Sequence, residues 1–125
     1  MPQAPSVLLV EDEREVRELV TEVLTMAGYR LFVAEDGAEA ARLLETDQAI
    51  DLLLTDVRMP SLDGFALAER FVRARPTGKV LYLTGFPDQM QRAEDPRLHG
   101  KMLWKPFRPS ELLVEVETTL GSTRR

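Results

Sequence analysis

The most informative absence in this 125-residue chain is cysteine, and histidine occurs only once. Without cysteine the chain has neither a disulfide framework nor a thiolate metal site. With a single histidine, a zinc site is also disfavoured. The absence of thiols fits the reducing cytoplasm, which we take as the expected location.

Long apolar runs and an excess of positive charge are missing too. No apolar run is long enough to span a membrane, and the N-terminus lacks the basic-then-apolar form of a signal peptide. The net charge is −5, which disfavours nucleic acid or an anionic membrane as a direct partner. We therefore expect no membrane insertion and no direct nucleic-acid binding.

What is present is the composition of a folded domain. Apolar residues make up 44% of the chain and charged residues 30%, which is typical of globular proteins. The length suits one domain with a full core and is too short for two. We predict a single domain over 1–125, with its core at about 5–121 and short flexible ends.

Short apolar runs alternate with amphipathic segments along the chain. The runs predict strands at 6–10, 31–34, 50–55, 79–83 and 101–104. Apolar residues at helical spacing follow each of the first three runs and the last. Residues 86–100 are the least regular, with at most a short helix near 88–93. This alternation predicts an α/β fold with a five-stranded parallel sheet, doubly wound and flavodoxin-like in strand order 2-1-3-4-5, with five helices.

Functional side chains follow four of the five predicted strands. Glu11 and Asp12 follow the first, Asp56 ends the third, Thr84 follows the fourth and Lys105 follows the fifth. Because parallel strands share a carboxyl edge, these groups should meet there. Carboxylates in one pocket repel each other and call for a cation, and hard oxygen ligands suit Mg²⁺ or Mn²⁺.

These groups are the parts required for phosphoryl transfer to a carboxylate. Asp56 can attack phosphorus while the metal ion and Lys105 neutralise the phosphoryl oxygens and the Thr84 hydroxyl donates a hydrogen bond.

In the order and spacing of these motifs, residues 5–121 resemble a response-regulator receiver domain. The motifs are Val-Glu-Asp at 10–12, Asp56 followed by Met59-Pro60 and Asp63-Gly64, Thr84-Gly85, and Lys105-Pro106-Phe107.

The resemblance implies a role for each site residue. Asp56 is the implied phosphoacceptor, Asp12 a direct Mg²⁺ ligand, Glu11 a ligand through water and the Arg58 carbonyl a further ligand. Thr84 and Lys105 would contact the phosphoryl group. The resemblance also implies a cis bond between Lys105 and Pro106.

The sequence departs from the family where a switch is expected. Three residues before the lysine, receiver domains commonly carry Tyr or Phe, whereas this chain has Met102. Phe86 closes an aromatic-x-Thr-Gly-aromatic pattern that begins at Tyr82. Our hypothesis is that Thr84 acts with Phe86, in place of Met102, to report phosphorylation.

Three other functions compete with a phosphorylation switch. An aspartyl-nucleophile phosphatase needs a second Asp two residues after the first, where this chain has Arg58. A receiver-like binding module without phosphorylation would show a broken acidic pocket or lack the lysine. A nucleotide-binding relative would need a glycine-rich loop in place of the acidic run 11–13.

The expected function is therefore a signalling switch that catalyses only its own phosphorylation and dephosphorylation. A sensor histidine kinase or a phosphotransfer protein would supply the phosphoryl group. An unidentified protein would then bind the face formed by the fourth and fifth strands and the last helix.

Overall fold

Strands and helices alternate along the computed structural model, which describes residues 4–59, 61–85 and 98–121. In chain order the elements are β1 (Ser6–Val10), α1 (Arg14–Met26), β2 (Arg30–Ala34), α2 (Gly37–Leu44), β3 (Leu52–Asp56), α3 (Gly64–Ala74), β4 (Lys79–Thr84), β5 (Gly100–Trp104) and α4 (Pro109–Thr119). The helix expected near 88–93 and the proposed switch residue Phe86 lie outside the described residues.

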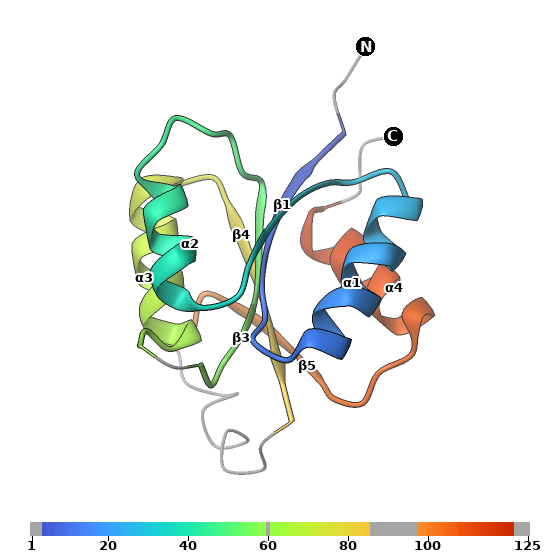
Figure 1. Cartoon of the computed structure of the whole chain (residues 1–125). Helices are drawn as coiled ribbons and strands as arrows, with labels where there is room; N and C mark the ends of the chain where they lie inside the picture. Colours follow the sequence, from blue (N-terminus) through green and yellow to red (C-terminus); the bar gives the residue numbers. More distant parts are fainter. Residues whose placement is uncertain (1–3, 60, 86–97, 122–125) are drawn as a thin grey trace.

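The five strands form one parallel sheet in the order β2-β1-β3-β4-β5. Helices α1 and α4 cover one face, and α2 and α3 cover the other (Figure 1). The predicted flavodoxin-like order is thus confirmed. The strand that follows β1 in sequence is added on one side of it and the later strands on the other, so the strand order reverses here and the carboxyl ends of β1 and β3 flank a crevice.

Burial along the strands follows their place in the sheet. Every residue of β1 and β3 is buried, whereas the edge strands β2 and β5 each have one buried residue and are otherwise exposed or partly buried. The central strands have helices on both faces, which explains their unbroken apolar sequences. Two core clusters result, one on each side of the sheet.

One residue of the predicted helical stripes is placed differently. Leu19 has helical spacing with the core residues of α1, yet its side chain is 41% exposed. It lies at the border of a stripe whose buried centre is Val20 and Leu24, so the helix turns Leu19 toward solvent.

The ends of the helices follow local sequence signals. Asp36 and Asp63 accept hydrogen bonds from the backbone N–H groups of Glu39 and Ala66, both at 2.8 Å. Gly28 follows the end of α1 with φ of 99°, a left-handed conformation that favours glycine. The Lys105–Pro106 bond is cis. Among the described residues, no helix is both long and apolar enough to cross a membrane.

Candidate functional site

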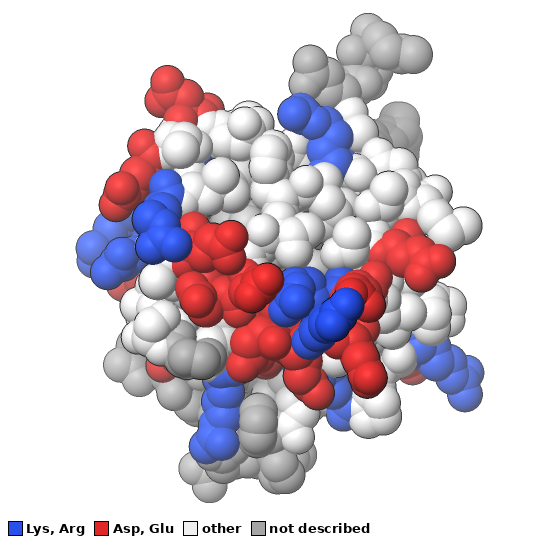
Figure 2. Space-filling model, in the orientation of Figure 1, with Lys and Arg blue, Asp and Glu red and all other residues white. Residues whose placement is uncertain are grey.

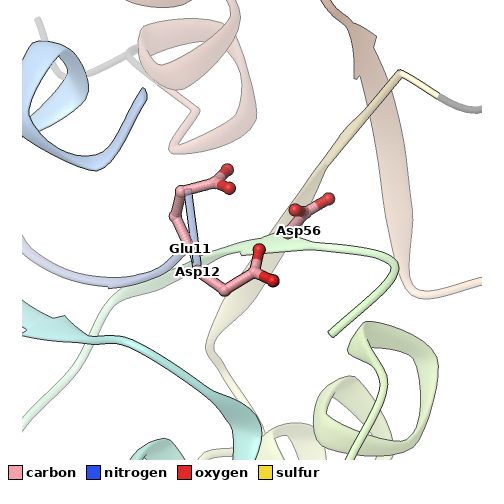
Figure 3. A group of neighbouring side chains, drawn as sticks. All are labelled: Glu11, Asp12 and Asp56. Carbon is pink, nitrogen blue, oxygen red and sulfur yellow. The ribbon is translucent and has the colours of Figure 1, made fainter. Parts of the chain in front are cut away.

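Three carboxylates meet at the carboxyl edge of the sheet, where β1 and β3 end. Glu11 and Asp12 directly follow β1, and Asp56 is the last residue of β3. One oxygen of each carboxylate lies within 4.8 Å of one from each of the others. The side chains converge from the two strand ends in Figure 3. Glu11 and Asp56 are buried and Asp12 is exposed, so the group has one side open to solvent.

Lys105 completes the group from the end of β5. Its Nζ lies 3.1 Å from Glu11 Oε1, 3.3 Å from Asp56 Oδ2 and 3.3 Å from Glu13 Oε1. The lysine side chain is only 16% exposed. One ammonium therefore faces three carboxylates in a confined space.

Backbone groups fix the acidic residues in place. The Val57 N–H donates to Asp56 Oδ1 at 2.9 Å, and the Glu13 N–H donates to Glu11 Oε2 at 3.0 Å. Gly64 allows α3 to begin against the end of β3, because a Cβ there would overlap the Asp56 carbonyl oxygen. The local chain geometry thus holds the carboxylates without help from a ligand.

The electrostatics of the site favour protons or a cation. Burial, reinforced by the charge of Asp56, raises the pKa of Glu11 from 4.5 to about 7. Burial also raises the pKa of Asp56, although Lys105 opposes the shift. Burial would lower the pKa of Lys105, but Asp56 and Glu11 outweigh it and raise that pKa instead. A divalent cation would relieve the repulsion that remains.

The donor set suits a hard divalent ion such as Mg²⁺. All of its side-chain donors are carboxylate oxygens, with no thiolate or imidazole among them. Glu11 Oε1 is buried, and Lys105 Nζ, which lies 3.1 Å from it, is shared with Asp56 and Glu13. Such an oxygen is costly to bury unless a cation or water satisfies it. The residues present therefore fit the metal ion.

The other predicted site residues lie around this centre. Thr84 is buried at the end of β4, and its carbonyl accepts a 2.7 Å hydrogen bond from the Lys105 N–H. The Arg58 side chain is exposed, two residues after Asp56. Met102 is partly buried and lies opposite Tyr82 in the pairing of β4 with β5.

The sequence prediction missed two charged residues that contact the site. Glu13 was noted only as part of an acidic run, yet its carboxylate reaches Lys105. Arg17 Nη1 donates to the Glu11 carbonyl oxygen at 3.0 Å, and its side chain is 16% exposed. Helical spacing places Arg17 one turn after Glu13, which is the only signal for it in the sequence.

The sequence of this chain is similar to those of known proteins. Residues 7–117 match the family described as the response regulator receiver domain. The chain belongs to this family. The receiver domain is 35% identical over 115 residues to the response regulator receiver protein CpdR of Brucella abortus, covering 91% of this chain and 95% of that protein.

Other relatives are longer or are known as structures. The receiver domain is 36% identical to the transcriptional regulatory protein CpxR of Escherichia coli over 91% of this chain but only 48% of CpxR. It therefore spans about half the length of that relative. The response regulator TrrA of Thermotoga maritima, solved in complex with Mg²⁺ and BeF, is 27% identical with a TM-score of 0.80, over 92% of this chain and 98% of that one.

One face of the receiver domain is rich in acidic side chains (Figure 2). Asp and Glu gather across the middle of this face, with basic side chains among them (Figure 2). Such a surface favours a divalent cation over free anions.

Proposed function

We propose that this receiver domain is a phosphorylation-dependent signalling switch in which Asp56 accepts the phosphoryl group. The observation that carries the proposal is the placement of Asp56. Its carboxylate is buried, held by the Val57 N–H, and 3.3 Å from Lys105 Nζ beside the acidic pair of Glu11 and Asp12. A residue with only a structural role would not need this excess of charge around it.

The chemistry is a transfer from a phosphohistidine to a carboxylate. An ionised oxygen of Asp56 attacks phosphorus, the phosphorus–nitrogen bond breaks, and the imidazole leaves with the electron pair. Lys105 donates hydrogen bonds to the phosphoryl oxygens and keeps Asp56 in its charged, nucleophilic form. We assign the Thr84 hydroxyl as a further donor to the phosphoryl group, because Thr84 ends the strand that pairs with β3.

The residues that would hold Mg²⁺ or Mn²⁺ are Asp12 and Asp56 directly, Glu11 through water, and the carbonyl of Arg58. When bound, the ion neutralises part of the charge on the transferred group. The Mg²⁺–BeF complex of the relative TrrA supports this assignment.

Intact mass spectrometry after incubation with Mg²⁺ and a small phosphodonor tests the proposal. We expect one phosphoryl adduct that is lost in Asp56→Ala and retained in Asp47→Ala, which removes an exposed carboxylate from the α2–β3 loop. Asp12→Ala should require more Mg²⁺ for the same yield. An adduct that forms without a divalent ion, or that persists in Asp56→Ala, would contradict the proposal. A wild-type domain that gains no adduct would favour a binding module without phosphorylation.

We propose a histidine kinase or a phosphotransfer protein as the donor, and the similar receiver domain from the hybrid histidine kinase CckA supports this. The lack of cysteine is compatible with the cytoplasm, where we place this exchange. In this proposal the domain is a regulatory phosphoacceptor and turns over no other substrate.

The downstream partner would bind the face formed by β4, β5 and α4. A groove of about 580 Å³ lies there, lined in part by Met102, Trp104 and Val114. Trp104 and Val114 are 37% and 58% exposed, so the groove presents apolar surface that a partner could bury. Hydrogen exchange with and without a phosphoryl mimic should change in these three elements. Unchanged exchange there would rule out this face as the one that responds.

A further inference from the structure

Glu13 occupies the N-cap position of α1 but does not cap the helix. Its side chain makes no capping hydrogen bond. The residues that usually cap a helix from this position are Ser, Thr, Asp and Asn, and Glu is not among them. The Glu13 carboxylate instead lies 3.3 Å from the ammonium of Lys105, 92 residues along the chain. This contact links the start of α1 to the residue after β5, and capping of α1 does not account for it.

The backbone of Glu13 is fixed on both sides. Its N–H donates to Glu11 Oε2 at 3.0 Å, and its carbonyl accepts the first hydrogen bond of the helix from the Arg17 N–H at 2.9 Å. Only the side chain can therefore change partner without disturbing the turn between β1 and α1.

The three carboxylates around Lys105 differ in their exposure. The Glu13 side chain is 66% exposed, whereas those of Glu11 and Asp56 are 0% and 4% exposed. Glu13 can leave the lysine and be solvated by water, but the other two cannot without unfolding the site. A phosphoryl group on Asp56 would compete for the same ammonium hydrogens and would be repelled by the nearby Glu13 charge.

We propose that Glu13 is a positioning residue that holds Lys105 in the resting site and must yield it to the phosphoryl group. Through this exchange Glu13 weakens the retention of the phosphoryl group. The inference rests on the proposed role of Asp56 as phosphoacceptor. Glu13 contributes little to folding in this role, because exposed ion pairs are weak and Lys105 keeps two buried partners.

The test is a titration with trifluoroberyllate, a phosphoryl mimic, in the presence of Mg²⁺. Trp104 is the single tryptophan and precedes Lys105 directly, so its fluorescence can report binding. Glu13→Gln should bind the mimic about two- to fivefold more tightly than wild type, as expected for one exposed charge interaction. Its affinity for Mg²⁺ alone should be equal or slightly lower, because the site has lost negative charge.

Glu15→Gln is the matched control, since it removes an exposed charge from the first turn of the same helix. We expect it to change the affinity for the mimic by less than Glu13→Gln does. The gain in Glu13→Gln should also shrink as salt is raised, because the charges are screened. A merely structural role would not produce tighter binding of the mimic together with unchanged or weaker binding of Mg²⁺.

Glu13→Asp provides a second variant whose folding is safer, because Asp is a favoured N-cap. It keeps the charge but is too short for the same contact, so a smaller gain is expected. Mimic affinities of Glu13→Gln and Glu13→Asp that match Glu15→Gln would overturn the role of Glu13. A wild-type domain that binds no mimic and gains no phosphoryl adduct would instead overturn the role of Asp56.

Discussion

Charged side chains are paired differently in two parts of the molecule, around the partly buried Arg75 and around the buried carboxylates of the site. At the end of α3, Arg75 donates to three carbonyl oxygens, from Nη1 to Leu44 at 3.3 Å, from Nη2 to Thr46 at 3.0 Å, and from Nε and Nη2 to Gln48 at 3.1 and 2.7 Å. At the carboxyl edge of the sheet, three described carboxylates share one ammonium, that of Lys105.

The difference separates a group that stabilises the fold from groups that are held ready for a ligand. The guanidinium of Arg75 has its donors satisfied by carbonyls at the end of α2 and in the following loop, where a cation is also favoured by the helix dipole. The carboxylates of the site are held by the backbone but remain short of positive charge. A cation that binds at the site can therefore still stabilise the carboxylates there. The contacts of Arg75, in contrast, already form when the chain folds.

The largest loss of stability that we predict comes from removing the hydrogen bonds of Arg75. Arg75→Ala should lower the free energy of unfolding by about 2–4 kcal/mol, because carbonyls at the end of α2 lose their charged donor. Urea unfolding at neutral pH measures this. Phosphorylation of the folded variant should be unchanged, because the site lies at the other end of the strands.

Arg73→Ala is the control for Arg75. Arg73 lies in the last turn of α3, but its side chain is 80% exposed, and the ion pair it forms within the described part of the chain is with Glu69 at 3.6 Å. Its removal should cost about 0.5 kcal/mol or less. Equal losses in Arg73→Ala and Arg75→Ala would show that the carbonyl contacts do not stabilise the fold, and the comparison would fail.

The two regions also differ in how well the sequence predicts them. The acidic site follows from a simple rule, because strands that end in Glu11, Asp56 and Lys105 must share an edge once the sheet is parallel. Arg75 gives no such signal. In the sequence it begins a Pro- and Gly-containing turn, and its acceptors are backbone carbonyls, which no residue pattern identifies.

Within the site, too, the sequence does not predict contacts between distant segments. The Glu13–Lys105 pair depends on the side chain of Glu13 turning away from its own helix. The position of Met102 opposite Tyr82 depends on the register of β4 with β5. Local patterns determine which elements form, whereas these contacts depend on how the elements pack.

A smaller effect on stability should come from the buried carboxylate of Glu11 at the site. The folded-state pKa of Glu11, about 7, exceeds its ordinary value of 4.5. Between these values the folded state holds a proton that the unfolded state has released, so the free energy of unfolding should fall as pH rises from about 4.5 to above 7. The full shift of Glu11 corresponds to at most about 3 kcal/mol.

Glu11→Gln removes this titration, because an amide stays neutral throughout. In EDTA at pH 8 the variant should be about 1–3 kcal/mol more stable than wild type, while the two should converge near pH 4.5. Urea unfolding at four pH values between 4.5 and 8 measures the difference. Asp56 also has a raised pKa. The free energy of unfolding of Glu11→Gln should therefore still fall with rising pH, but less steeply than that of wild type. The free energy of unfolding of wild type and of Glu11→Gln could instead fall equally with rising pH. The burial of Glu11 would then not destabilise the fold, and Asp56 alone would distinguish the site from Arg75.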